Sequence, residues 1–139
     1  MAETGRYFKL QVIAPDRVFL EEDAEMVELT TTEGEIGVLK DHIPLTAIVA
    51  PGILRVKKDG QQKEAALHEG FLEILPDKVV ILAESCEWPE EIDINRANEA
   101  KIRAERRLKG ADAEINETRA ELALRRSLVR LSLAEKQRI

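Results

Sequence analysis

Four arginines in the last third of the chain are the residues best suited to recognition chemistry. Arg96 and Arg103 are seven residues apart, so on a helix they share one face two turns apart. Arg126 and Arg130 are four residues apart, which is about one turn. If the two segments form an antiparallel hairpin that turns at Gly110, the second pair lies near the segment "IDINRA" at the start of the first helix. The sequence therefore predicts a cluster of positive charge at this end of a helical hairpin.

Such a cluster requires negative charge nearby, because like charges held a few ångströms apart repel each other. Two sources of this negative charge are compatible with the sequence. One is a polyphosphate ligand, whose oxygens suit the planar, forked donors of arginine. The other is a set of exposed ion pairs within the chain, each contributing roughly 0–1 kcal/mol, and spacing alone favours it. The candidate acids are Glu90, Glu91, Glu99 and Glu121.

Familiar catalytic motifs are missing from the sequence. It has no GxxxxGK[ST] phosphate loop and no GxGxxG turn. His42 and His68 have no cysteine or paired carboxylate at metal-ligand spacing, so no metal site is predicted. Ser85 has no evident histidine base, and the single Cys86 is interpreted as an inert thiol. We therefore expect a protein that is not an enzyme and that uses no catalytic cofactor.

Charge is divided unevenly along the 139 residues. Residues 1–89 contain 9 Lys and Arg against 17 Asp and Glu, residues 90–139 contain 12 against 10, and the net charge is −6. An acidic body with only 4% aromatic residues is poorly suited to phosphate contacts and base stacking, so no nucleic-acid partner is expected. The longest charge-free run, "HIPLTAIVAPGIL", is shorter than the ~20 residues that span a bilayer. Direct membrane insertion is therefore not expected.

The hydrophobic pattern of the sequence changes near residue 90, from a period typical of strands to one typical of helices. The helices after this point must hold the arginines. Up to about Ala83, alternating runs such as "FKLQVIA" and "AEMVELTTT" are typical of strands. Turns at "DGQQ" and "PDK" indicate two hairpins. Many short strands at regular spacing favour a β-sandwich or a barrel. We predict a β-sandwich domain over residues 1–88.

From Ile92 onward the period is helical. Asp93 can cap a first helix that runs to about Lys109, where Gly110 ends it. A second helix can start at Asp112, and its apolar stripe suits packing against another helix or a groove. The predicted fold is α+β by segregation, with a β-sandwich followed by an antiparallel two-helix hairpin over residues 89–139. The stripe comprises Ile115, Leu122, Val129 and Leu133, with Leu124, Leu128 and Leu131 beside it.

Three segments, in this order, resemble the epsilon subunit of bacterial F-type ATP synthase over essentially the whole chain. They are "EGEIGVLKDHIPL" at 33–45, "GFLEILPDKVVILAE" at 70–84 and "IDINRA…ELALRRSLVRLSLAE" in the tail. The resemblance implies a non-catalytic central-stalk subunit, peripheral to the cytoplasmic face of the bacterial cell membrane, whose sandwich contacts the gamma subunit and the c-ring. Many members of the family have "PGH" where this chain has "KDH" at residues 40–42.

The resemblance also implies a regulatory role for the hairpin. In that family the two helices either fold down or extend toward the catalytic alpha and beta subunits, where they block ATP hydrolysis. Some members bind one ATP, without hydrolysing it, through an I-D-x-x-R-A motif that "IDINRA" reproduces; the resemblance leaves a role for magnesium open. The implied c-ring contacts are Glu35 and His42. The motif residues, Ile92, Asp93, Arg96 and Ala97, are expected to face the nucleobase side, while most of the arginines meet phosphates. The implied ATP-binding residues are Glu87, Ile92, Asp93, Arg96, Ala97, Arg103, Arg126 and Arg130.

These implications combine into a switch in which ATP holds the hairpin folded and low ATP favours the inhibiting arm. A second helix of about 26 residues would reach roughly 40 Å at ~1.5 Å per residue, which is enough to enter a partner. A ligand shifts such an equilibrium only by its different affinities for the two states. The alternative is a structural assembly adaptor whose hairpin stays folded and binds no nucleotide.

Overall fold

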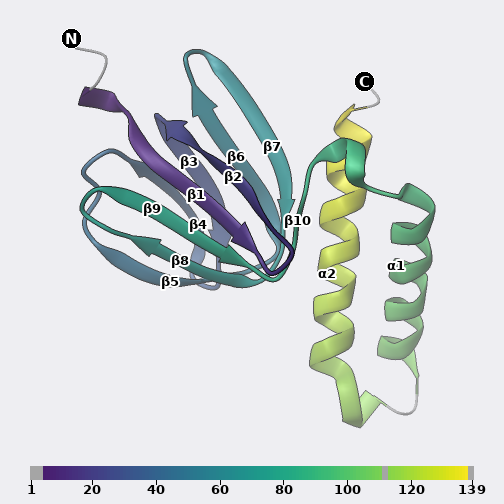
Figure 1. Cartoon of the computed structure of the whole chain (residues 1–139). Helices are drawn as coiled ribbons and strands as arrows, with labels where there is room; N and C mark the ends of the chain where they lie inside the picture. The colour runs from purple at the N-terminus through teal and green to yellow at the C-terminus, as the bar shows by residue number, and fades with distance from the viewer. Residues whose placement is uncertain (1–4, 111–112, 138–139) are drawn as a thin grey trace. The chain divides into compact units, whose positions relative to one another are not determined.

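The structure, a computed structural model, describes residues 5–110 and 113–137. It divides into two compact units, Met1–Cys86 and Glu87–Ile139, which are described separately. Strands make up the first unit, and the second contains the helices α1, Ile94–Lys109, and α2, Ala113–Gln137 (Figure 1).

The strands form a β-sandwich, as the alternating runs predict. One layer has the order β4-β3-β6-β7-β10 and the other has the order β5-β8-β9-β1-β2. The layers are joined where β3 pairs with β5 through Thr31 and Val49. Strand β1 runs parallel to β9 and antiparallel to β2. The bounds are β1 Phe8–Ala14, β2 Arg17–Ala24, β3 Met26–Thr31, β4 Gly34–Leu39, β5 Leu45–Val49, β6 Gly52–Lys58, β7 Gln61–Leu67, β8 Gly70–Ile74, β9 Lys78–Ala83 and β10 Cys86–Glu87.

The core of the first unit follows from the two-residue period of the strands. In β1 every second residue from Phe8 to Ala14 is buried, because successive side chains point to opposite faces. Leu29, Leu54, Leu72 and Ile81 from other strands are also almost fully buried. Both predicted hairpins are present, as β6–β7 and β8–β9. In β1 the alternating pattern therefore specified which face of the strand packs inward.

The first helix begins and ends where the sequence predicts. The side chain of Asp93 accepts a hydrogen bond from the backbone N–H of Arg96 at 3.1 Å, which caps α1. Helix α1 ends at Lys109, and Gly110 follows it. Before α1 lies a single 3-10 turn, η2 Pro89–Glu91, where the N–H of Trp88 donates to the Glu91 carboxylate at 2.8 Å. The predicted start at Asp112 lies outside the described residues.

Helices α1 and α2 pack against each other along small residues rather than along a wide leucine stripe. The buried residues of α1 are Ala97 and Ala104, and α2 buries Ala120, Ser127 and Ala134 at intervals of seven. Small side chains allow two helix axes to approach closely. The mostly polar α1 therefore packs against α2 through a narrow line of small residues.

The predicted leucine stripe of α2 is only partly buried. Leu133 is fully buried, whereas Leu128 remains 45% exposed. The side chain of Ile115 lies outside the described residues. Neither α1 nor α2, over the described residues, is long and apolar enough to cross a membrane.

Candidate functional site

A hollow of about 330 Å³ lies in the helical unit at the start of α1. The segment before α1, the first turns of α1 and one residue of α2 contribute its walls. Its volume is at the lower end of the range typical of small-molecule sites, about 300–1,000 Å³. We call it the arginine hollow, and its lining residues are Glu87, Glu91, Asp93, Arg96, Ala97, Ala100, Arg103 and Arg130.

Six of the eight residues that the resemblance implied for ATP lie together in this lining. The other two, Ile92 and Arg126, are not among the described residues that line it. Ile92 is half-buried and its N–H donates to the Pro89 carbonyl at 3.2 Å, while Arg126 is half-buried on α2, one turn before Arg130. The lining gathers the remaining three predicted arginines from two helices.

Two residues of the lining were not in the predicted set. Ala100 follows Ala97 by three residues, so both belong to one face of α1. Glu91 ends the 3-10 turn that leads into the capping residue Asp93. The helical periodicity of the sequence could have identified Ala100. The position of Glu91 depends on the 3-10 turn, which periodicity does not reveal.

Arginine and carboxylate charges balance each other in the hollow. The Arg130 Nε lies 2.6 Å from Glu87 Oε1, and each of these side chains is about one-quarter exposed, at 27% and 25%. Asp93 directs one carboxylate oxygen to the N-terminus of α1. From the sequence, Glu87 is expected only as an ATP-binding residue, and the acids proposed for ion pairing are Glu90, Glu91, Glu99 and Glu121. The structure thus supplies an internal counter-ion for Arg130.

The arginine hollow offers groups that suit the binding of an anion. Guanidinium groups from α1 and α2 offer several N–H donors to a polyanion, and none of the lining residues is a Ser, Cys, His or Lys nucleophile. Within residues 5–110 and 113–137, no group of three or more His, Cys, Asp and Glu is arranged to hold a metal ion.

The two residues implied for the c-ring lie at opposite ends of strand β4. Glu35, whose side chain is 73% exposed, is near the start of the strand and lies 3.8 Å from Arg55. His42 follows the end of β4, where its N–H donates to the Leu39 carbonyl at 3.2 Å. The His42 Nδ1 is 2.8 Å from the carbonyl oxygen of Ile43. The structure does not gather these two side chains into one site.

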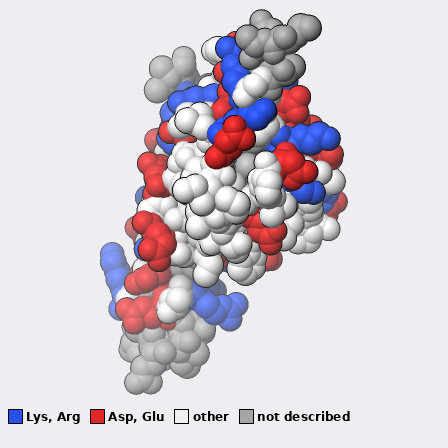
Figure 2. Space-filling view, turned by 90° about the vertical axis from the view of Figure 1, so that its left-hand side faces the viewer, with Lys and Arg blue, Asp and Glu red and all other residues white. Residues whose placement is uncertain are grey.

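An exposed apolar row on the outer face of the sandwich was not anticipated. Strand register aligns Ile48, Phe71 and Leu82, which are 55%, 53% and 41% exposed. The row continues through Ile13 to Val18, which is 56% exposed. Contiguous exposed apolar surface of this kind is typical of interaction sites. The continuous apolar run "VVILA" could have predicted this surface, because β9 places apolar residues on both of its faces. On the face shown in Figure 2, uncharged side chains form a continuous area with charged residues around it.

Comparison with known proteins connects this fold to one class. The family described as "ATP synthase, Delta/Epsilon chain, beta-sandwich domain" matches residues 7–89, and "ATP synthase, Delta/Epsilon chain, long alpha-helix domain" matches residues 90–135. A solved structure of the Euglena gracilis mitochondrial ATP synthase, comprising OSCP, F1 and the c-ring, contains a similar chain. Its TM-score is 0.80 and its identity is 26%, with 94% of this chain and 82% of that one covered. A Tetrahymena thermophila central stalk and c-ring structure shares the fold alone, at 13% identity and a TM-score of 0.56, over 95% of this chain and 96% of that one.

A β-sandwich followed by a helical hairpin therefore places the molecule in the class of ATP synthase delta and epsilon chains. The curated relatives are more specific. The chain is 52% identical over 130 residues to the ATP synthase epsilon chain of Caldanaerobacter subterraneus subsp. tengcongensis, covering 93% of this chain and 94% of the relative. It is 46% identical to that of Ruminiclostridium cellulolyticum, covering 94% and 98%. The chain belongs to the ATP synthase delta/epsilon chain family. Its homologues are epsilon chains, a non-catalytic stalk subunit of the synthase, and the expectation of a non-enzyme is confirmed.

Proposed function

We propose that this chain is a central-stalk subunit of an F-type ATP synthase whose sandwich joins the rotor and whose hairpin is a regulatory arm. The apolar row supports a protein partner on the sandwich, and we assign it to the gamma subunit. Glu35 and the turn at His42 are assigned to the polar loops of the c-ring. In this arrangement the chain lies at the cytoplasmic face of the bacterial membrane without entering it.

The regulatory part rests on one observation, the gathering of arginines from both helices around the arginine hollow. We propose that ATP binds there without being hydrolysed, with its nucleobase side at Arg96 and Ala97 and its phosphates at Arg103 and Arg130. The volume of about 330 Å³ suits a nucleotide that fills the hollow and leaves part of its surface in water.

The same geometry explains how ATP would act on the arm. Because the lining combines α1 with Arg130 of α2, a ligand bound there contacts both helices only while the hairpin is closed. A ligand that binds one state stabilises it by RT ln(1 + [L]/Kd), which is about 2.7 kcal/mol at a hundredfold excess over Kd. Falling ATP would then release α2 toward the catalytic alpha and beta subunits, where it inhibits hydrolysis.

One contact favours the alternative, a structural adaptor whose hairpin stays folded and binds no nucleotide. Glu87 already neutralises Arg130 at 2.6 Å, so the hairpin possesses an internal tie. In that case the arginine hollow would be satisfied by the acids of its own lining. The two functions differ in whether ATP is needed to hold the arm.

Isothermal titration calorimetry of ATP into the isolated full-length chain separates these functions. The regulatory function predicts saturable binding with one ATP per chain, no phosphate release, and a binding heat that is lost when the arginines are replaced. In the assembled enzyme, inhibition of hydrolysis should increase as ATP is lowered. Absence of binding at millimolar ATP, with unchanged inhibition, would establish the adaptor.

A further inference from the structure

A second hollow, in the sandwich unit, has no role in the proposed function. It measures about 620 Å³ and lies where Leu39 ends β4, Met26 begins β3 and Lys57 and Lys58 end β6. Its volume is in the middle of the range typical of small-molecule sites. We call it the cationic hollow.

The charge of this hollow is opposite to that of the unit around it. Residues 1–89 contain only 9 Lys and Arg against 17 acids, yet four of those cations line this one hollow with a single acid, Glu25. The four are Arg6, Lys40, Lys57 and Lys58. In an acidic domain, this concentration of positive charge on one concave surface favours an anionic occupant.

Acids hold both Arg6 and Lys57 at the edge of the hollow. Arg6 lies 3.5 Å from Glu25 and 3.7 Å from Asp59, and Lys57 lies 3.1 Å from Glu28. Lys58 is different, because its Nζ lies 6.0 Å from the centre of the Tyr7 ring and the described residues place no acid at ion-pair distance from it. Lys58 therefore provides the charge that a ligand can use most directly.

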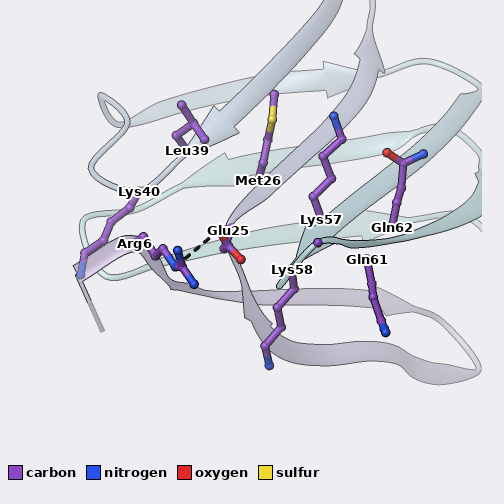
Figure 3. A pocket seen from close by; sticks show the side chains of 10 residues that line it. Arg6, Glu25, Met26, Leu39, Lys40, Lys57, Lys58, Gln61 and Gln62 are labelled. Atoms are coloured by element: carbon purple, nitrogen blue, oxygen red, sulfur yellow. Dashed lines mark ion pairs between the residues drawn. The ribbon is translucent and has the colours of Figure 1, made fainter. Parts of the chain in front are cut away.

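The surface beside these cations is apolar. Met26 is half-buried and Leu39 is 58% exposed, and the methylene stems of Lys57 and Lys58 add apolar area. Figure 3 shows Lys40 and Arg6 at one end of the hollow and the two glutamines, Gln61 and Gln62, at the other. An apolar surface with a few polar groups at its edge is typical of ligand sites.

We propose that the cationic hollow binds a small amphiphilic anion, a phosphate monoester or carboxylate joined to an apolar chain or ring. The apolar body lies against Met26 and Leu39, and the anionic group meets Lys58 and Lys40. Gln61 and Gln62 offer neutral amide donors at the other end of the hollow (Figure 3). This site is independent of the arginine hollow, because every lining residue belongs to the sandwich unit.

Nuclear magnetic resonance titration of the full-length chain tests this site. Octyl phosphate, used below its micelle concentration, should cause saturable shifts of the Met26 methyl and of the side-chain amides of Gln61 and Gln62. Octanol has the apolar chain without the anionic group, and inorganic phosphate has the anionic group without the chain. Each should bind at least tenfold more weakly than octyl phosphate. Equal affinity for octanol and octyl phosphate, or shifts located elsewhere, would overturn the proposal.

Charge-reversed variants locate the anionic group. Lys40→Glu combined with Lys58→Glu should weaken octyl phosphate binding by roughly ten- to a hundredfold, as expected for lost charge-assisted contacts. The matched control, Lys9→Glu with Lys78→Glu, makes the same change in net charge outside the hollow and should alter the affinity less than twofold. If the first variant loses its native spectrum, Lys58→Gln alone should still weaken binding severalfold. Undiminished binding in these variants would refute the assignment.

Two further measurements distinguish binding in the cationic hollow from binding in the arginine hollow and from binding to a membrane surface. Arg130→Ala, which alters the arginine hollow, should leave octyl phosphate binding unchanged, so the two proposals fail or succeed independently. Vesicles of phosphatidylglycerol test whether the anion comes from a membrane surface instead. Binding to vesicles without any binding of free octyl phosphate would show that the hollow does not take a small amphiphile.

Discussion

Glu87 and Arg130 are 43 residues apart in the sequence, yet they form an ion pair with 2.6 Å between Oε1 and Nε. Glu87 precedes α1, and Arg130 lies in the second half of α2, so the pair ties the start of the helical unit to its last helix. Because both side chains are about three-quarters buried, solvent weakens this pair less than it weakens a fully exposed one. The closed hairpin therefore possesses an electrostatic tie that requires no ligand.

A double-mutant cycle should measure this tie. We expect Glu87→Gln and Arg130→Gln each to lower the stability of the helical unit, with a coupling of roughly 1 kcal/mol between them. Thermal unfolding followed by circular dichroism at 222 nm, without ATP, gives the four stabilities. Additive effects of the two substitutions would show that the pair contributes nothing to closure.

The turn at residues 40–42 predicts a stabilising substitution. Asp41 has φ +65°, a left-handed conformation that costs energy for residues with a side chain. Asp41→Gly should raise the free energy of unfolding by roughly 0.5 kcal/mol, since relief of strain exceeds the added entropy of the unfolded chain. Urea denaturation measures the change.

Gly60 provides the opposite test of the same reasoning. Its φ is +77°, and a Cβ added there would meet no atom within 4 Å. Gly60→Ala should therefore destabilise the sandwich by about 1 kcal/mol through backbone strain alone. Equal stabilities of both variants and the parent chain would contradict the strain argument.

Local patterns were sufficient for most of the fold. The two-residue period and the turn residues "DGQQ" and "PDK" identified the β6–β7 and β8–β9 hairpins, and Asp93 marked the start of α1. Strands β2, β4 and β5 were not identified from the sequence. In β2 the outer positions are acidic, and its partner β1 carries an irregularity between Val12 and Ile13. Patterns within one element predicted that element well.

Relationships between elements were harder to predict. The sequence placed Arg96 and Arg103 on one helix face, but the position of Arg130 relative to Glu87 depends on how α2 packs on α1. That packing uses Ala97, Ala104 and the small residues of α2, whereas hydrophobic periodicity drew attention to leucines. The apolar row likewise exists only through the register of five strands.

Modularity gives a third prediction. The first unit ends at Cys86, and Arg17 Nη2 donates to the Cys86 carbonyl at 3.2 Å, so its last strand is fixed within the sandwich. A chain ending at Trp88 should fold, bind the gamma subunit and c-ring, and lose inhibition of hydrolysis. Activity assays on the reconstituted enzyme measure the inhibition. A truncated complex as inhibited as the complete one would rule out the arm.

The arginine hollow gives a fourth prediction. Arg130→Ala should weaken ATP binding roughly ten- to a hundredfold, because a charge-assisted contact contributes about 1.5–3 kcal/mol. Arg126→Ala should also weaken binding, by less, since Arg126 does not line the hollow. Arg119→Ala, exposed on α2 and outside the lining, is the control and should change the affinity little. Equal ATP affinities of the parent chain and the three variants would rule out the arginine hollow as the ATP-binding site.

The apolar row gives the last prediction. Ile48 and Phe71 are opposite each other on β5 and β8, and more than half of each side chain is exposed, so neither contributes much to the core. Ile48→Ser with Phe71→Ser should therefore change the stability of the isolated chain by less than about 1 kcal/mol. Binding to the gamma subunit should fall at least tenfold, because apolar side chains at the centre of an interface carry much of its binding energy. Thr46→Ala with Glu73→Ala, a pair on the same two strands and the same outer face, is the matched control. Surface plasmon resonance with immobilised gamma subunit measures both variants, and an affinity loss that is equal in the two would show that the apolar row is not the contact surface.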